Sequence, residues 1–229
     1  MVPPAVFLDA MGTLVQLERP WPHLVAALAS RGVAIDEQQA REAMLAEIGY
    51  YREHHDEAGT EAGLDDLRRR CAEVVAHTLG ADVIGALPAV EIEAAMLEAL
   101  RFRAYPEVPG VLAGLRADGY RLVVVSNWDI SLNYVLEQTG LASLVDAVVV
   151  SAQEGCAKPN PRIFTRALEL AGTDADHATH VGDSVEADVV GAQRAGIRAV
   201  FVDREGAGTR QVDGASVIAD LGGLASVLG

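Results

Sequence analysis

Short apolar runs of strand length alternate with longer segments of helical periodicity along most of this chain. Most of these runs are apolar throughout, which is typical of strands that are covered on both faces. Strands that alternate with helices in this way form parallel sheets. The pattern therefore predicts an α/β fold whose parallel sheet is built from residues 5–8, 122–125, 147–150, 179–181 and 199–202, with a further short strand at 217–218.

The region between residues 21 and 102 interrupts this alternation. Strand-like runs disappear there, and apolar residues recur at helical spacing in three separate sets. This block is expected to be a helical insertion that follows the first strand. We therefore predict a core of residues 1–16 and 104–229 and a helical cap of residues 17–103. The helices expected in the core cover residues 108–117, 131–139, 161–171 and 186–195, with one more at the C-terminus.

Residues with reactive side chains follow the predicted strands, at the edge where parallel sheets place their binding sites. Asp9 ends the first run, and Gly12 allows the chain to turn tightly after it. Ser126 and Asn127 end the second run, where a hydroxyl and backbone N–H groups can hold an anion. Lys158 follows the third run and can neutralise a carboxylate or a bound phosphate. Each is an ordinary turn or surface residue by itself, so their shared placement is what indicates a site.

Two further carboxylates, Asp183 and Asp188, follow the fourth run across a strand-to-helix turn. If they converge on Asp9, the three carboxylates repel one another unless a cation lies among them. An all-oxygen site that keeps several waters suits Mg²⁺. The sequence therefore predicts a Mg²⁺ site at this edge of the sheet, with helix capping as the alternative role of Asp183 and Asp188.

Charge and composition narrow the possible partners. The net charge is −15, from 33 acidic and 18 basic residues. A nucleic-acid-binding protein needs a basic face, and the densest basic cluster, residues 68–70, lies in an acidic helical stretch, so no nucleic-acid partner is expected. No apolar run is long enough to span a membrane, and no secretory signal is evident. We expect a cytoplasmic protein without a disulfide framework, since Cys71 and Cys156 are its only cysteines. The sequence does not indicate an oligomeric state.

Four segments together resemble the motifs of the haloacid dehalogenase-like superfamily. They occur in the family's order, each after a strand, and the resemblance covers nearly the whole chain. The helical insertion is similar to the cap that this family places just after its first motif. The string at 125–129 further resembles a subfamily of poorly characterised hydrolases. The family implies a five-stranded Rossmann-like core and a mobile helical lid. The matching segments are 9–14, 126–127, 158–159 and 181–188.

The resemblance also implies roles for the matching positions. Asp9 would be the nucleophile that attacks a small phosphorylated substrate. Ser126 and Lys158 would hold the phosphoryl group during transfer, and Asn127 and Thr13 would contact the substrate. The ligands implied for Mg²⁺ are Asp9, the backbone carbonyl of Met11 and Asp183, supported by Asp188.

Position 11 departs from the pattern of the family's phosphatases. Most of them carry a second aspartate two residues after the nucleophile, where this chain has Met11. That carboxylate normally protonates the leaving group and then activates water, and losing such catalysis costs on the order of 10²–10⁴-fold in rate. The implied metal ligand is not affected, because a backbone carbonyl is present whatever the side chain.

Three interpretations follow from this departure. The protein is a phosphohydrolase whose substrate has a good leaving group, or whose acid comes from the cap or from Asp129. Alternatively it is a haloacid dehalogenase; these enzymes also lack the second aspartate, but they typically carry tyrosine there and lack the Gly–Asp pair kept here at Asp183. In the third interpretation it is a metal-binding module that has lost turnover. The cap is expected to select the substrate, with candidates Trp21, His23, Tyr50, Tyr51, Arg52, His54 and His55.

Overall fold

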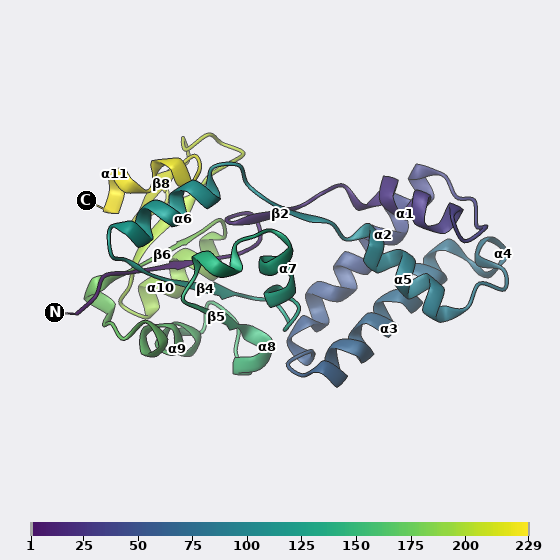
Figure 1. Cartoon of the computed structure of the whole chain (residues 1–229), viewed down its shortest axis with the longest axis horizontal. Coiled ribbons are helices and arrows are strands. Elements are labelled where there is room, and N and C mark those ends of the chain that lie inside the picture. The colour runs from purple at the N-terminus through teal and green to yellow at the C-terminus, as the bar shows by residue number, and fades with distance from the viewer. Residues whose placement is uncertain (1, 229) are drawn as a thin grey trace. The chain divides into compact units, whose positions relative to one another are not determined.

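The computed structural model describes residues 2–228, and the chain forms two units (Figure 1). The first unit contains Met1–Gln16 and Arg103–Gly229, and the second contains Leu17–Phe102. A separate pair of short strands, β2 (Val15–Leu17) and β3 (Phe102–Ala104), forms where the chain passes between the units. The sequence did not predict this pair, because runs of three residues are too short to show a periodicity.

The first unit is built on a six-stranded sheet with the order β5-β4-β1-β6-β7-β8, and its pairings are parallel. This confirms the predicted α/β fold with a Rossmann-like core. The family implied five strands; the sixth, β8, pairs with β7 at the sheet edge and is longer than the predicted 217–218. The strands are β1 (Ala5–Leu8), β4 (Arg121–Ser126), β5 (Ala147–Val150), β6 (Ala178–Gly182), β7 (Arg198–Val202) and β8 (Ala215–Ile218).

The register of the central strands brings their carboxyl ends together. Leu8 in β1 pairs with Val124 in β4 and with Val181 in β6. Residues that follow these partners by one or two positions therefore lie at one edge of the sheet. This edge carries Asp9, Ser126 and Asp183.

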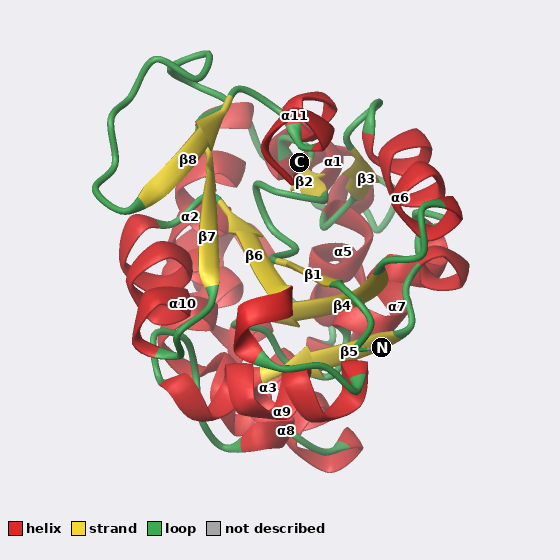
Figure 2. Ribbon diagram, turned by 90° about the vertical axis from the view of Figure 1, so that its left-hand side faces the viewer, coloured by secondary structure: helices red, strands yellow, loops and turns green. Residues whose placement is uncertain are grey.

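Side chains on the two faces of the sheet pack against different helices. Phe7, Val123 and Val125 alternate along their strands and join one buried cluster with Ile163 and Phe164 of α9. In Figure 2, α8 and α9 lie on one side of the sheet and α6 and α7 on the other. Both faces are therefore covered, which explains why the strands are largely apolar. The α-helices of this unit are α6 (Val108–Ala117), α7 (Leu132–Gln138), α8 (Ser151–Glu154), α9 (Pro161–Ala171), α10 (Gly191–Arg194) and α11 (Ala225–Leu228).

The single helix predicted at 186–195 is wrong in detail. The segment begins as a π-helix, η4 (Val185–Val190), and continues as the short α10. The wider π turn accompanies the packing of Asp188 against the backbone of Ser184, and such turns are frequent at functional sites. The 3₁₀ turns of this unit are η2 (Ala142–Leu144), η3 (Ala175–His177) and η5 (Leu221–Gly223).

The second unit is helical. Asp36 and Gln39 form a reciprocal capping box at the start of its second helix, and Thr60 caps the third by accepting from the backbone N–H of Gly63. No helix in residues 2–228 has the length and apolar character needed to cross a membrane. The elements of this unit are α1 (Pro20–Ala29), α2 (Glu37–His54), η1 (His55–Glu57), α3 (Glu61–Leu79), α4 (Ala81–Ile84) and α5 (Ala89–Ala99).

Candidate active site

Asp9 follows β1 directly, and its buried carboxylate receives two side-chain hydrogen bonds. Ser126, the last residue of β4, donates its hydroxyl to Oδ1 of Asp9 at 3.1 Å. The ammonium of Lys158 donates to the same oxygen at 2.6 Å. The structure thus brings three predicted residues together. Among residues 2–228, no side chain donates to the other carboxylate oxygen, Oδ2, of Asp9.

Lys158 is the only lysine in the chain, and it is buried between two carboxylates. Its Nζ lies 2.6 Å from Oδ1 of Asp9 and 2.6 Å from Oδ1 of Asp188. Burial by itself would lower the pKa of Lys158, but the two carboxylates outweigh burial and raise it, so the side chain is charged. A compact ammonium can bridge carboxylates from different elements, whereas a planar guanidinium is shaped for both oxygens of one.

Asp188 is held by three donors. Its Oδ1 accepts from Lys158 and from Nε2 of His180 at 2.8 Å, and its Oδ2 accepts from the backbone N–H of Ser184 at 2.9 Å. Burial alone would raise the pKa of Asp188, but Lys158 and His180 outweigh it and lower that pKa. The carboxylate is therefore ionised, and its oxygens are already engaged, which suits the predicted supporting role.

His180 was not singled out by the sequence analysis. It lies in the middle of β6, fully buried, with its ring 4.9 Å from that of Phe164 in an edge-to-face arrangement. Burial lowers the pKa of His180, so the ring is neutral, and the ionised Asp188 assigns the proton to Nε2. The signal that could have identified it is a titratable residue within an otherwise buried strand.

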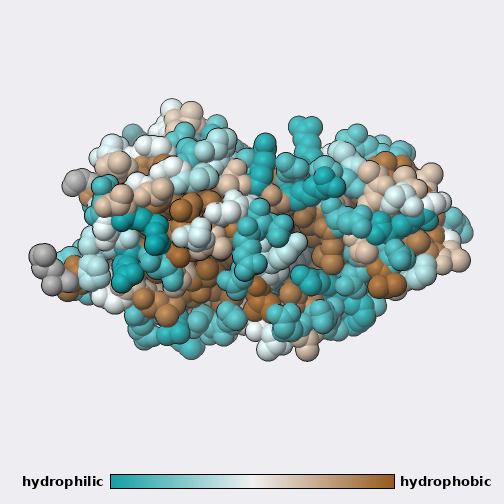
Figure 3. Space-filling view, in the orientation of Figure 1, coloured by the Kyte–Doolittle hydropathy of each residue, from teal (hydrophilic) through white to brown (hydrophobic). Residues whose placement is uncertain are grey.

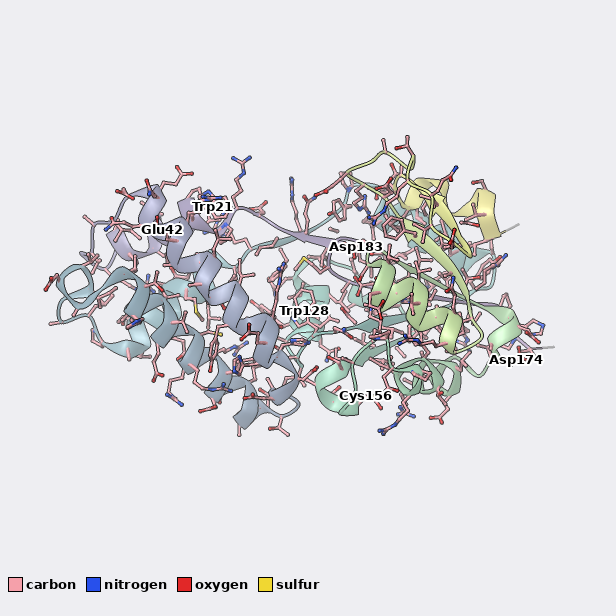
Figure 4. All side chains as sticks on the ribbon, turned by 180° about the vertical axis from the view of Figure 1, so that it is seen from behind. Trp21, Glu42, Trp128, Cys156, Asp174 and Asp183 are labelled. Carbon is pink, nitrogen blue, oxygen red and sulfur yellow. The ribbon has the colours of Figure 1, made fainter. Side chains whose placement is uncertain are left out.

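Asp183 and Asp188 occupy space that two glycines leave open. A Cβ atom at Gly12 would overlap the carboxylate of Asp183, and one at Gly182 would overlap that of Asp188. Gly12 also has a left-handed conformation, with φ of +79°. Figure 4 labels Asp183 beyond the end of β6, whereas Asp174 lies before that strand. The glycines therefore let these carboxylates approach Asp9 closely.

The carboxylate cluster fits a divalent cation. One oxygen from each of Asp9, Asp183 and Asp188 lies within 4.8 Å of the others. Loss of hydration, followed by the charges of Asp9 and Asp188, raises the pKa of Asp183 to about 7, although Asp183 is exposed at the surface. When all three are ionised, the ammonium of Lys158 leaves a surplus of two negative charges. Oxygen donors with surplus negative charge are the set that Mg²⁺ prefers.

Asn127 acts on the backbone of Lys158. Its Oδ1 accepts from the N–H of Lys158 at 2.7 Å, and its Nδ2 donates to the carbonyl of the same residue at 2.9 Å. Both polar atoms of this amide are thus used to fix the loop that carries the ammonium. A direct contact between Asn127 and a substrate stays a prediction.

Residues 10–15, which follow the predicted nucleophile Asp9 and are called the nucleophile loop below, are closed by their own backbone hydrogen bonds. The N–H groups of Leu14 and Val15 donate to the carbonyl of Ala10 at 2.8 and 2.9 Å. The N–H of Gly12 donates to the carbonyl of Val15 at 2.9 Å. Because the N–H and C=O of one trans peptide point in opposite directions, this last bond also fixes the direction of the Met11 carbonyl.

The remaining predicted residues differ in exposure. Met11 is 36% exposed and is one of the large apolar residues at the surface. These residues come from separate elements of the chain. The face of the molecule seen in Figure 3 accordingly shows a mixture of hydrophilic and hydrophobic residues. Thr13 is fully buried, and its role toward a substrate stays a prediction. Asp129 is also buried, and its Oδ1 accepts from the backbone N–H of Ser131 at 2.6 Å. A role for Asp129 as the missing acid likewise stays a prediction.

The helical unit has a polar cluster of its own. The rings of Tyr50 and His54 stack with centroids 4.0 Å apart, and Arg70 donates to the Tyr50 hydroxyl at 2.7 Å. Arg70 also pairs with Glu57 and Asp66. These contacts account for Tyr50 and His54 within the unit, and the selection of a substrate by the cap stays a prediction.

Comparison with known proteins agrees with this geometry. The sequence pattern of the haloacid dehalogenase-like hydrolase family matches residues 3–196. The mouse haloacid dehalogenase-like hydrolase domain-containing protein 3 is 31% identical over 220 residues, which cover 90% of this chain and 83% of that protein. The protein therefore belongs to the haloacid dehalogenase-like hydrolase family and is a hydrolase.

Two solved structures match over nearly the full length. A phosphatase of this family from Thermococcus onnurineus is 28% identical with a TM-score of 0.67, covering 99% of this chain and 98% of that one. A 2-haloacid dehalogenase from Pseudomonas syringae is 25% identical with a TM-score of 0.64, covering 100% and 98%. The fold is therefore shared by both reaction types, so the site must distinguish between them.

Proposed function

We propose that the protein is a Mg²⁺-dependent phosphatase that acts on a small phosphorylated metabolite through an aspartyl-phosphate at Asp9. The observation that carries the proposal is the convergence of Asp9, Asp183 and Asp188 at the carboxyl edge of the sheet, where Asp9 and Asp188 share the single ammonium of Lys158. The surplus negative charge needs a cation, and Ser126 and Lys158 offer donors for phosphoryl oxygens. The likeness to the Thermococcus phosphatase supports the same reaction type.

The residues of this chain divide the reaction between them. Asp9 attacks phosphorus, so that an O–P bond forms on its carboxylate while the ester P–O bond breaks and the leaving oxygen takes up a proton. Water then cleaves the acyl phosphate, which releases phosphate and restores the carboxylate. Ser126 and Lys158 orient the phosphoryl group. Asp9, Asp183 and the Met11 carbonyl would hold Mg²⁺, which would supply positive charge to neutralise the phosphate.

The proposal is tested with Asp9→Asn and Asp183→Asn. Asp9→Asn should abolish phosphate release from an activated aryl phosphate, because an amide does not form the acyl phosphate at a useful rate. Mg²⁺ at about one hundred times its Kd should stabilise the wild type by about 2.7 kcal/mol, which is measured as a rise in Tm. Asp183→Asn should make that rise in Tm smaller. Asp118→Asn is the matched control, because this exposed carboxylate precedes β4, at the opposite end of the strands. Wild-type turnover in Asp9→Asn would show that the chemistry occurs elsewhere.

Dehalogenation is the second candidate, favoured by the likeness to the Pseudomonas enzyme and by the absence of a carboxylate at Met11. Halide needs no protonation as it leaves, so the reaction would not require an acidic side chain at position 11. Asp183 argues against this reaction, since a carboxylate placed against Asp9 without a metal only opposes its ionisation. Chloride release from a 2-chloro acid without Mg²⁺, and no phosphate release with it, would favour dehalogenation.

A further inference from the structure

Arg204 contacts the nucleophile loop, although the sequence analysis did not single it out. It follows β7 by two residues, and its Nε donates to the carbonyl of Gly12 at 2.8 Å. Its Nη2 donates to the carbonyl of Thr13 at 2.7 Å. Bonds from a charged donor are roughly twice as strong as neutral ones. Two consecutive peptide groups, directly after Met11, are thus held by one guanidinium.

The guanidinium is itself held from two other directions. Its Nη1 lies 2.8 Å from a carboxylate oxygen of Glu107, and its carbon lies 3.4 Å from the ring centroid of Tyr105. The backbone N–H of Tyr105 also donates to the carbonyl of Leu14 at 3.1 Å. A guanidinium that is already stacked on a ring and paired with a carboxylate loses little further conformational entropy when it binds the loop. Arg204 therefore has an orientation set by groups outside the loop.

The strand order shows where the contact between Arg204 and the nucleophile loop lies in the sheet unit. β6 lies between β1 and β7 in the sheet, so Arg204 reaches from the end of β7, past the end of β6, to the loop after β1. Asp183 follows β6 and packs against Gly12, whose carbonyl Arg204 holds. The bonds inside the loop fix its shape, whereas Arg204 fixes its place relative to the neighbouring strands.

We propose that Arg204 is a positioning residue of the active site. It anchors the carbonyls of Gly12 and Thr13, and through them keeps the Met11 carbonyl and Asp9 in place against Asp183. The inference rests on the proposed function, because it assigns to Arg204 an effect on the reaction at Asp9. A displacement of about 1 Å in such a site can cost 10²-fold in rate. Arg204→Ala should therefore lower kcat by about 10- to 100-fold while KM stays within about twofold.

The matched control lies on the same strand. Arg198 begins β7, and its Nε donates to the hydroxyl of Thr179 at 3.0 Å, at the end of the sheet opposite the site. Arg198→Ala also removes an arginine hydrogen bond, but should leave kcat unchanged. Arg204→Lys keeps a donor and should recover part of the rate. Millimolar guanidinium should partly restore kcat in Arg204→Ala but not alter Arg198→Ala, an outcome that general destabilisation would not produce.

A second measurement does not depend on turnover. Native-state hydrogen exchange of the peptide spanning residues 9–16 should be at least tenfold faster in Arg204→Ala than in the wild type or Arg198→Ala. If the wild type hydrolyses no phosphate ester, the proposed function fails, while faster exchange still supports the anchoring of the loop. Unchanged exchange in folded Arg204→Ala overturns the inference, and so does a fall in kcat that Arg198→Ala reproduces.

Discussion

Each unit of this protein contains a buried carboxylate, and the surroundings shift the pKa values of these two groups in opposite directions. Asp188 in the sheet unit is 2% exposed, and Glu47 in α2 of the helical unit is 3% exposed. Asp188 is paired with Lys158 and His180, which lower its pKa. Glu47 has a hydrogen bond with Cys71 but no ion pair among the described residues, and burial raises its pKa to about 7. Burial of a carboxylate alone therefore does not mark the candidate active site.

The contrast between Asp188 and Glu47 is tested most strongly by Lys158→Met, which removes the positive charge that stabilises the buried carboxylates of Asp9 and Asp188. Two carboxylates, Asp9 and Asp188, would then be left without a cation between them. Breaking a buried ion pair in this way costs about 3–5 kcal/mol of stability, and losing a donor to the reacting group costs about 10²–10³-fold in kcat. Urea unfolding and phosphate release measure the two effects.

Lys158→Arg separates charge from shape in the same experiment. It keeps the positive charge, so stability should recover in part. It should not restore kcat, because the guanidinium cannot place one compact charge 2.6 Å from both Asp9 and Asp188. Wild-type activity in Lys158→Arg would show that only charge matters at this position.

A carboxylate can also be added to the candidate active site in the sheet unit. Met11→Asp places an acid in the nucleophile loop, where its proton can pass to the leaving oxygen. At saturating Mg²⁺ the rate should rise by up to about 10²-fold for alkyl phosphates and by less for an activated aryl phosphate. The wild type should accordingly show a steep dependence on leaving-group pKa.

Met11→Asn is the control for this gain, since it matches aspartate in size but offers no acid. Similar wild-type rates on alkyl and aryl esters would mean that another residue already supplies the proton. If neither the wild type nor folded Met11→Asp hydrolyses any phosphate ester, yet both bind phosphate, the protein is a binding module.

The sequence predicted the sheet unit in considerable detail for a physical reason. All-apolar strands leave a strong pattern, and a parallel sheet collects whatever follows its strands at one edge. The placements of Asp9, Ser126 and Asp183 at that edge follow from this alone. The helices 108–117 and 161–171 were predicted to the residue, as α6 and α9.

Other features depend on tertiary contacts that leave no local pattern. The π turn of η4 and the partners of Arg204 arise from packing between segments far apart in sequence. His180 did carry a signal that went unused, since it is a titratable residue inside a strand; Lys158 was predicted from its place after a strand, and being the only lysine of the chain was a further signal. The roles of the site residues and the action of residues 17–103 as a cap stay predictions.

Glu47 should make the stability of the protein depend on pH. Its pKa is about 7 in the folded protein, against an ordinary value of 4.5 in an unfolded chain. Between these values the folded protein keeps a proton that the unfolded chain has released, so raising the pH favours unfolding. The wild type should lose stability as pH rises from about 4.5 to 7 and level off above.

Glu47→Gln removes the part of this dependence that Glu47 contributes, because the amide cannot ionise and can still bond to Cys71. Relative to the wild type, it should gain on the order of 2 kcal/mol in unfolding free energy between pH 5 and pH 8. Glu42→Gln, on the exposed face of the same helix (Figure 4), should show no such gain. Parallel pH curves for Glu47→Gln and the wild type would mean that this carboxyl is compensated after all, and the contrast with Asp188 would be lost. Curves that diverge as pH rises would establish that the helical unit tolerates a buried acid without an ion pair, whereas Asp188 in the sheet unit is paired with Lys158 and His180.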